Sequence, residues 1–312
     1  MKPKKRKTVW AVMLILVAAV AAVWWWMTPS RHIPCASCGT LERHESFASH
    51  YVSKRTVTVW LPEGYRVGDS CAVIYMHDGQ MLFDAATTWN HQEWEVDETL
   101  CRMMGAGQVR PCIVVGIDNS EVRLHEYFPS GAAAFLPPSL RNDPKAADPR
   151  GDNYLKFVVE EVKPFVDEHY RPLTDRANTF MIGSSMGGLI SLYALCQYPD
   201  VFGGVACLSS HLSFSHLDRK ASQEQWLHAF VEYLNHRLPA ANSALVYMDH
   251  GTATLDAEYG PCQETVDSVF MAKGWDESHY KSLVFKQQEH SETAWASRLS
   301  HPLQFLIGKQ AD

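Results

Sequence analysis

Short apolar runs and longer amphipathic segments alternate along most of the chain. Two stretches of alternating polarity, 41–52 and 56–61, predict an opening antiparallel strand pair. Apolar runs predict further strands at 71–76, 111–117, 178–182, 202–208, 244–248 and 282–285. Apolar residues at helical spacing predict helices at 94–104, 152–170, 189–197 and 291–307. This order predicts an α/β fold with a mostly parallel, doubly wound sheet and flanking helices.

Two long segments interrupt this alternation where strands end. Residues 128–150 are rich in Pro and Ala, and residues 211–242 are polar but contain Trp226, Phe230 and Tyr233. Ligands of doubly wound folds bind at the carboxyl ends of the strands, so both segments are candidate walls of a substrate site. For the second segment, a surface helix with its aromatic rings in the core is an equally good interpretation.

The N-terminal residues follow a different pattern. Residues 8–27 contain no charge and are long enough, at roughly 30 Å as a helix, to cross a bilayer core. Residues 1–7 are strongly basic, which keeps this end in the cytoplasm, and Trp24 to Trp26 suit the far membrane interface. We therefore predict a cytoplasmic segment (1–7), a single-pass signal anchor in the inner membrane (8–27), a linker (28–39) and a periplasmic domain (40–312).

The alternative for this segment is a signal peptide that is cleaved, which would leave a secreted protein. Ala19-Val20-Ala21 matches a cleavage site. This site lies inside the apolar run, and cleavage would expose the three tryptophans, so the anchor is favoured. The residues before Cys35 do not form a lipidation motif.

Composition narrows the partners of the domain. The chain has 312 residues and a formal net charge of -7, and its basic residues beyond the N-terminus form no stripe interleaved with aromatic residues. This balance argues against nucleic acid as a partner and leaves a small molecule as the expected one.

The cysteines of an outward-facing domain would lie in an oxidising compartment. Cys35 and Cys38 could form a local disulfide, a redox pair or half of a zinc site, or belong to an ordinary linker. No second closely spaced Cys or His pair completes a zinc site, so we predict no metal. Other cysteines fall in apolar patterns and are expected to be buried: Cys71, Cys112, Cys196 and Cys207. Their pairing does not follow from the sequence.

The stretch Gly183-Ser184-Ser185-Met186-Gly187 follows an apolar strand and precedes a helix that ends before Pro199. Strand, tight turn and helix are the context in which the pattern G-x-S-x-G marks a nucleophile elbow. The glycines let strand and helix approach closely, and the strained turn exposes the serine hydroxyl. Ser185 is therefore the predicted nucleophile, against the alternative of an ordinary Gly/Ser loop.

A serine nucleophile needs a base, and the base needs an orienting acid. In folds with this elbow, the acid and then the histidine follow the serine along the chain. His290 opens the closing helix after the last strand and is the predicted base. Asp256, in the loop after the 244–248 strand, is the predicted acid, and Asp249 at the end of that strand is the runner-up.

The oxyanion that forms during acyl transfer needs two N–H donors. The backbone N–H of Met186, next to the nucleophile, is the first. The backbone N–H of Gln80, in the loop after the 71–76 strand, is the second. This chemistry needs no cofactor, and none is predicted.

Several motifs are similar to those of a known family. They are 57–62 (VTVWLP), 76–80 (MHDGQ) with Leu82-Phe83, 114–119 (VVGIDN) with Arg123 and Glu126-Tyr127, 160–167 (EEVKPFVD), 183–188 (GSSMGG), 249–252 (DHGT) and 290–295 (HSETAW) with Arg298-Leu299. Across 55–307 the chain resembles the putative-esterase branch of the α/β-hydrolases. This branch includes feruloyl and acetyl-xylan esterases, siderophore esterases, S-formylglutathione hydrolases and mycolyltransferases.

The resemblance implies an α/β-hydrolase fold and a serine esterase activity. It implies Ser185 as nucleophile, His290 as base, and Gln80 and Met186 as oxyanion donors. The resemblance implies the identity of the acid less directly. The spacing from Gly251 to the predicted acid is longer than usual, and some family members work with a weak or absent acid.

We therefore expect a membrane-anchored periplasmic serine esterase that hydrolyses carboxylic esters through an acyl-enzyme. Its topology resembles that of periplasmic siderophore esterases, so siderophore lactones and aromatic esters are the expected substrates. Aromatic residues in or beside loops are candidates to stack on an aryl acyl group, although packing in the core explains each of them equally well: Trp89, Trp94, Tyr127, Phe128 and Trp226. An acyltransferase of the same fold and a non-catalytic, hydrolase-like binding protein are the alternatives.

Overall fold

The computed structural model describes residues 33–141, 148–217 and 220–309. The residues from Cys35 onward form one compact unit. The predicted cytoplasmic segment (1–7) and signal anchor (8–27) lie outside the described residues, as does the first part of the linker. In the described part of the chain, no helix has both the length and the apolar character that a membrane crossing requires.

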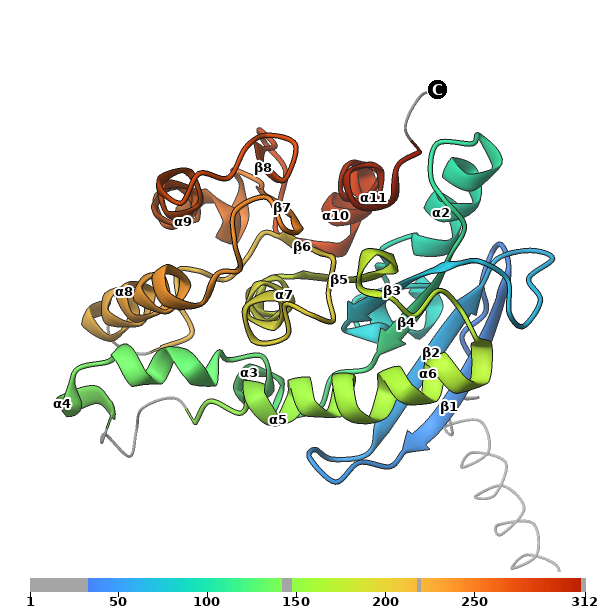
Figure 1. Cartoon of the computed structure of the whole chain (residues 1–312), viewed down its shortest axis with the longest axis horizontal. Coiled ribbons are helices and arrows are strands. Elements are labelled where there is room, and N and C mark those ends of the chain that lie inside the picture. The colour runs from blue at the N-terminus through green and yellow to red at the C-terminus, as the bar shows by residue number, and fades with distance from the viewer. Residues whose placement is uncertain (1–32, 142–147, 218–219, 310–312) are drawn as a thin grey trace, which may run out of the picture. The chain divides into compact units, whose positions relative to one another are not determined.

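Eight strands form a sheet in the order β1-β2-β4-β3-β5-β6-β7-β8 (Figure 1). They are β1 (Thr40–Phe47), β2 (Arg55–Leu61), β3 (Ala72–His77), β4 (Cys112–Ile117), β5 (Thr179–Ser184), β6 (Gly204–Leu208), β7 (Leu245–His250) and β8 (Tyr280–Val284). The pairs β1/β2 and β2/β4 are antiparallel, and every other neighbouring pair is parallel. The predicted opening pair and the mostly parallel sheet are thus confirmed.

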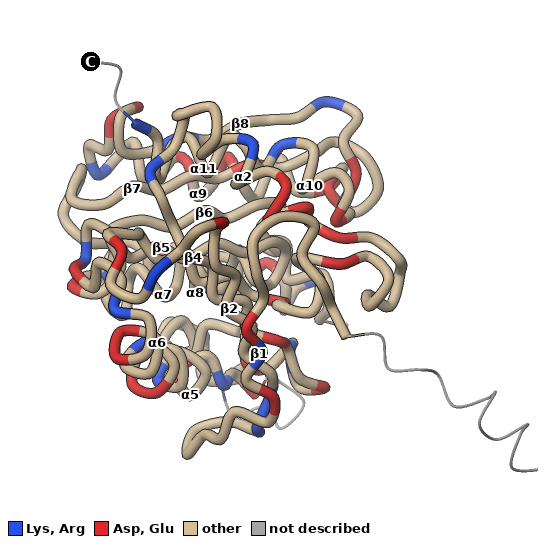
Figure 2. Tube along the Cα trace, turned by 90° about the vertical axis from the view of Figure 1, so that its right-hand side faces the viewer, with Lys and Arg blue, Asp and Glu red and all other residues tan. Residues whose placement is uncertain are grey.

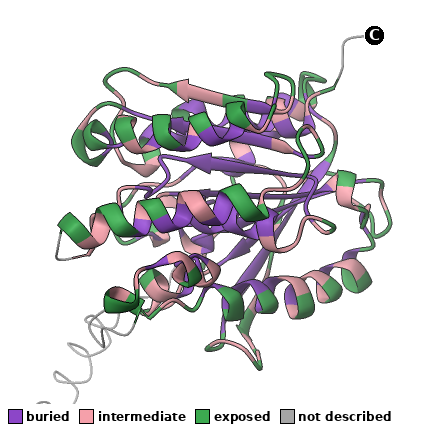
Figure 3. Cartoon of the chain, turned by 60° about the vertical axis from the view of Figure 1, so that its left-hand side comes forward, coloured by how far each residue is buried: buried purple, intermediate pink, exposed green. Residues whose placement is uncertain are grey.

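Helices cover both faces of the sheet (Figure 1). One face packs against α5 (Gly151–Lys156), α6 (Lys163–Tyr170), α7 (Met186–Gln197), α8 (Lys220–Arg237) and α9 (Gly260–Ala272). The other packs against α2 (Val96–Gly105), α10 (Glu292–Arg298) and α11 (Ser300–Ile307). Along β3, Val73 and Tyr75 enter the first core, whereas Ile74 and Met76 enter the second. Because both faces are buried (Figure 3), inner strands such as β3, β4 and β6 are continuous apolar runs rather than alternating ones.

Two segments predicted as single helices are divided in the structure. The 152–170 segment runs from α5 through a π-helical turn (Phe157–Val162) into α6. The buried side chains of Phe157 and Val166 both stay in the core. The closing helix is divided at Leu299 into α10 and α11.

The two long inserts contain ordinary packed structure. Residues 128–150 include a 3-10 helix (Ser130–Phe135) and α4 (Pro138–Arg141), and residues 211–242 include α8. Trp226, on α8, is buried and packs edge-on against Phe128 with 4.5 Å between ring centroids. Phe230 and Tyr233 are buried as well, so the interpretation of the second insert as a helix with core aromatics is confirmed.

Charged positions of both signs are mixed along the chain. Figure 2 shows Lys and Arg positions interspersed with Asp and Glu positions, without a continuous basic stripe on this side of the described residues. Inside the molecule, Arg55 pairs with Glu126 at 2.7 Å and Arg298 pairs with Asp249 at 3.0 Å. All four side chains are nearly inaccessible, so these are structural ion pairs rather than surface contacts.

A disulfide joins Cys38 to Cys101 on α2, across 63 residues of sequence. A local pair of Cys35 and Cys38 therefore does not form, and the Cys35 backbone N–H instead donates to Asp84 at 3.1 Å. The remaining cysteines are free thiols, and four are buried as expected: Cys71, Cys112, Cys196 and Cys207. Residues 35–39, inside the predicted linker, are thus fastened to the domain.

Removing this disulfide should destabilise the domain. The entropy of closing a loop between residues 63 positions apart predicts a loss of about 4 kcal/mol in the free energy of unfolding of Cys38→Ala/Cys101→Ala. Chemical denaturation of the full-length protein in detergent, without reductant, measures this loss. Cys35→Ala changes an exposed thiol nearby and is the matched control. Equal stability of the double variant and the wild type would contradict the assignment.

Candidate active site

Ser185 lies between the end of β5 and the start of α7. Its backbone adopts φ 56° and ψ -124°, which is strained for a residue with a side chain. The Ser185 N–H donates to the Leu208 carbonyl at 2.9 Å, and the His211 N–H donates to the Ser185 carbonyl at 3.0 Å. A Cβ atom at Gly183 would lie 2.6 Å from the Gly187 backbone, so no side chain fits there. The turn therefore has the geometry of a nucleophile elbow.

The structure brings His290 and Asp256 together. Nδ1 of His290 lies 2.6 Å from Oδ1 of Asp256, which is 1% exposed. Burial favours a raised pKa for Asp256, but hydrogen bonds from His290, Ser209 and the Gly251 N–H outweigh it and lower the pKa. Asp256 therefore stays ionised near neutral pH and can orient the imidazole, as the acid of a triad does.

Asp249, the runner-up acid, has different partners. Its Oδ1 accepts hydrogen bonds from Nε and Nη2 of Arg298 at 3.2 and 3.0 Å. Its Oδ2 accepts one from the Tyr247 hydroxyl at 3.0 Å. Both carboxylate oxygens are therefore engaged in a fully buried ion pair, while the contact with His290 belongs to Asp256.

Ser209, in the loop after β6, joins the two carboxylates. Its hydroxyl donates to Oδ2 of Asp256 at 2.5 Å and accepts from Nη2 of Arg298 at 2.8 Å. It also accepts from Nε1 of Trp295 at 3.0 Å. This buried network holds the loops after β6 and β7 against α10. Sequence reasoning missed Ser209, because a single serine after a strand is not a signal.

The predicted oxyanion donors both lie at helix starts. Met186 is the first residue of α7, and Gln80 is the second residue of a short 3-10 helix (Gly79–Met81) that follows β3. The first N–H groups of a helix have no intrahelical acceptor, so they are available to an oxyanion.

The loop that carries Gln80 is held by an ion pair. The Asp78 carboxylate accepts hydrogen bonds from Nε and Nη2 of Arg123 at 2.6 and 2.7 Å, and from Asn119 at 2.6 Å. Burial opposes ionisation of Asp78, but these donors outweigh it and lower the pKa. Asp78 is itself in the left-handed region at φ 56°, so the hydrogen bonds hold a strained turn in place.

Tyr259 is a neighbour of the nucleophile that sequence reasoning missed. Its hydroxyl is within hydrogen-bonding reach of Ser185 and lies 2.7 Å from Nδ1 of His211. Its ring packs edge-on against the His290 imidazole, with 5.6 Å between centroids. Burial lowers the pKa of His211 to about 3, so this ring is neutral at physiological pH. A neutral Tyr–His pair thus lies beside Ser185.

Ser185 and His290 line one cavity of about 560 Å³. Three tryptophans contribute to its walls. Trp94 lies 5.5 Å from Trp295 between ring centroids, and Trp89 is 80% exposed. Polar side chains complete the lining: Asn90, Gln92, Asn119, Arg123 and Glu292. The cavity therefore combines aromatic faces with hydrogen-bonding groups.

The predictions for the cavity walls are right in part. Trp89 and Trp94 line the cavity as expected, but Tyr127, Phe128 and Trp226 are buried in the core and offer no free face. None of the described residues of the two inserts lines this cavity, so the prediction that they form its walls is wrong for those residues. Trp295, which was not predicted, lines the cavity as well. Its position five residues after His290 is the sequence feature that could have identified it.

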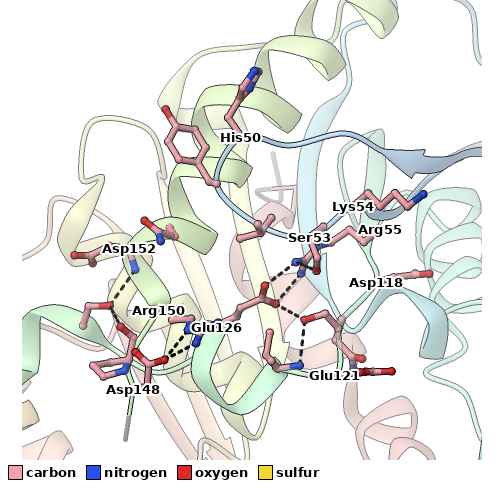
Figure 4. A pocket seen from close by; sticks show the side chains of 18 of the residues that line it. His50, Ser53, Lys54, Arg55, Asp118, Glu121, Glu126, Asp148, Arg150 and Asp152 are labelled. Atoms are coloured by element: carbon pink, nitrogen blue, oxygen red, sulfur yellow. Dashed lines mark hydrogen bonds and ion pairs between the residues drawn. The ribbon is translucent and has the colours of Figure 1, made fainter.

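A larger cavity, of about 1490 Å³, shares Asn119 with the first. Figure 4 shows that charged side chains there pair with one another, Arg55 with Glu126 and Arg150 with Asp148. Neither the predicted nucleophile nor the predicted base lines it. The predicted nucleophile and base both line the smaller cavity instead.

Residues 49–306 match the model of the "Putative esterase" family. The chain belongs to this family. The match includes Ser185, Asp256 and His290, together with the loops that hold them. Membership and fold together support a hydrolase of ester bonds.

Individual relatives are distant. "Uncharacterized protein YbbA" of Bacillus subtilis is 23% identical over 271 residues, which cover 85% of this chain and 97% of that protein. The siderophore enterobactin esterase of Emericella nidulans is 30% identical over 148 residues, which cover 46% of this chain and 47% of the relative. A solved ferulic acid esterase structure has a TM-score of 0.63 at 19% identity, over 86% of this chain and 98% of that one. This last likeness shows the fold alone.

Replacing the two aspartates should separate catalysis from stability. Asp256→Asn removes the charge that orients His290, so kcat for a p-nitrophenyl ester should fall by roughly 10³- to 10⁴-fold while the protein stays folded. Asp249→Asn leaves the buried Arg298 only its longer, 3.9 Å ion pair with the Asp256 carboxylate, so the free energy of unfolding should fall by about 3–5 kcal/mol. Steady-state kinetics and chemical denaturation of both variants measure these effects.

The reverse pattern, with kcat lost in Asp249→Asn alone, would identify the runner-up as the acid. If neither substitution lowers kcat, a Ser–His dyad or another carboxylate operates, and the role assigned to Asp256 is wrong.

Proposed function

We propose that this protein is a serine esterase that acts in the periplasm and is held to the inner membrane by residues 8–27. The catalytic part rests on the 2.6 Å contact between His290 and the buried Asp256, at the cavity that also contains Ser185. The Cys38–Cys101 disulfide supports an oxidising compartment, since such bonds rarely persist in the cytosol. Secretion after signal cleavage is the alternative for the location.

In the proposed reaction, the Ser185 hydroxyl attacks the ester carbonyl while His290 accepts its proton. The N–H groups of Met186 and Gln80 stabilise the oxyanion of the tetrahedral intermediate. His290 then gives the proton to the departing alcohol, which leaves an acyl-enzyme. Water, deprotonated by the same imidazole, releases the acid and restores the hydroxyl. In both steps, Asp256 stabilises the imidazolium that forms.

The nucleophile is tested with short p-nitrophenyl esters. The full-length protein in detergent should hydrolyse them, and Ser185→Ala should lose at least about 10³-fold in kcat, because the variant lacks the hydroxyl that attacks the ester carbonyl. Ser268→Ala, on the exposed side of α9, is the matched control and should keep full activity. A fluorophosphonate probe should label the wild type and not Ser185→Ala.

Other outcomes have distinct meanings. Full activity in Ser185→Ala would mean that another residue is the nucleophile. A folded wild type that neither hydrolyses esters nor reacts with the probe would instead favour a binding protein. Transfer of the acyl group to added sugar alcohols in preference to water would make the enzyme an acyltransferase.

The proposed substrates are esters that carry aromatic rings, either catecholate siderophore lactones or plant-type aromatic esters. Trp94 and Trp295 form an aromatic wall of the cavity, and Trp89 exposes most of its surface beside it. Aromatic rings favour offset or edge-on contact with another ring by about 0.5–1.5 kcal/mol beyond the area buried. The names of two relatives, a siderophore enterobactin esterase and a ferulic acid esterase, support these two kinds of substrate.

Substrate choice should therefore depend on Trp89. The wild type should show a higher kcat/KM for feruloyl and catechol-acyl esters than for acetyl esters. Trp89→Ala should lower kcat/KM for the aryl esters by roughly 2- to 10-fold, the equivalent of one ring contact, and leave acetyl esters nearly unchanged. Met271→Ala, another exposed apolar side chain, is the control. A wild-type kcat/KM no better for aryl than for acetyl esters would leave a small-acyl esterase.

A further inference from the structure

Three carboxylates converge at the start of α2, outside the site described above. Glu93 lies shortly before the helix, and Asp97 and Glu98 lie in its first turn. One oxygen atom of each side chain lies within 4.8 Å of the corresponding atoms of the other two. The three side chains therefore present a compact set of oxygen ligands.

Each of these carboxylates has a buried oxygen without a hydrogen-bond partner. These atoms are Oε2 of Glu93, Oδ1 of Asp97 and Oε2 of Glu98. The Asp97 residue is 0% exposed, so its free oxygen has no access to solvent. Buried charges in proteins are paired or coordinate metals. No Lys, Arg or His among the described residues forms an ion pair with any of the three.

Backbone donors hold the other side of the cluster. Oδ2 of Asp97 accepts hydrogen bonds from the N–H groups of Ser37 at 2.7 Å and Cys38 at 3.2 Å. The Ala85 N–H interacts with the Glu93 carboxylate. Contacts of this kind orient a carboxylate and leave its second oxygen directed at a ligand, as they do around bound metal ions.

We propose that Glu93, Asp97 and Glu98 bind one calcium ion. Carboxylate oxygens are hard ligands, which suit Ca²⁺ or Mg²⁺ better than zinc or copper. Ca²⁺ accepts several carboxylates in a flexible geometry, whereas Mg²⁺ keeps most of its waters and uses one or two carboxylates. Three buried oxygens leave little room for such waters and therefore favour Ca²⁺.

A shared proton is the rival occupant. Burial and the neighbouring Glu98 raise the pKa of Asp97 to about 7, so the pair can hold a proton near neutral pH. Glu98 on the same helix disfavours ionisation of Asp97, and Glu93, before the helix, completes the cluster.

The ion would lie between the residues beside the disulfide and the wall of the Ser185 cavity. Asp97 already contacts the backbone beside the Cys38–Cys101 disulfide, and Glu93 directly precedes Trp94. Trp94 packs on Trp295 at the wall of the Ser185 cavity. Calcium would therefore stabilise the domain and this wall without touching a reacting atom.

The test uses full-length protein in detergent, stripped of metal with EDTA. Equilibrium dialysis with radioactive calcium should find one ion per chain, and saturating CaCl₂ should raise the Tm by several degrees, since the ion binds only the folded state. Glu98→Gln should weaken binding at least about 10-fold and abolish the rise in Tm. Glu95→Gln, which changes an exposed acid next to the cluster, is the matched control and should bind normally.

If Glu98→Gln is unstable, Glu93→Gln takes its place in the comparison, because Glu93 lies before the helix. The proposal is overturned if the wild type binds no calcium at millimolar concentration, or if both variants bind it as well as the wild type. Preference of the same residues for Mg²⁺ would overturn the choice of ion. A Tm that responds to pH but not to CaCl₂ would assign the cluster to a shared proton. None of these measurements depends on ester hydrolysis, so their outcome is independent of the proposed activity.

Discussion

The buried pairing of Arg298 with Asp249 is the interaction on which the active-site edge depends. Two aspartates and one arginine are enclosed where β6, β7 and α10 meet, and Ser209 bonds to both Arg298 and Asp256. A buried ion pair adds little net stability, but a buried charge without its partner is very costly. Only an arrangement that satisfies all these groups at once is stable, so the loop with Asp256 and the helix after His290 take one relative position. The orientation of the imidazole follows from that position.

A second constraint is the strained backbone at Ser185. Its positive φ persists because the Leu208 carbonyl and the His211 N–H hold the turn from both sides. Asp78 has a positive φ as well, and Arg123 and Asn119 hold its carboxylate. Strain on both sides of the cavity is thus balanced by hydrogen bonds within rigid elements. This leaves the N–H groups of Met186 and Gln80 pre-oriented, which is the condition for stabilising an oxyanion without reorganisation.

The wall of the cavity is built by another part of the molecule. Trp89 and Trp94 lie in the connection between a short 3-10 helix (Ala85–Thr87) and α2. This connection contains no regular secondary structure. The helix that follows, α2, is tied to the residues around Cys38 by the disulfide to Cys101 and by the hydrogen bonds to Asp97. The inserts that contain Phe128 and Trp226 pack instead into the core. The aromatic surface available to a substrate therefore depends on the connection into a covalently fastened helix, and not on the longest insertions.

The sequence by itself determined the α/β fold, the opening antiparallel pair, the buried strands and the elbow at Ser185, because these follow from periodicity and from turn chemistry within a few residues. It also limited the candidates for the acid that orients the histidine to two aspartates. Only the tertiary structure decided that Asp256 meets His290, 34 residues away, and that Asp249 pairs with Arg298. It likewise joined Cys38 to Cys101 and placed Trp295, rather than Trp226, beside the cavity. Contacts of this kind depend on the path of the loops and on the joint satisfaction of buried polar groups, and neither is encoded in a local pattern.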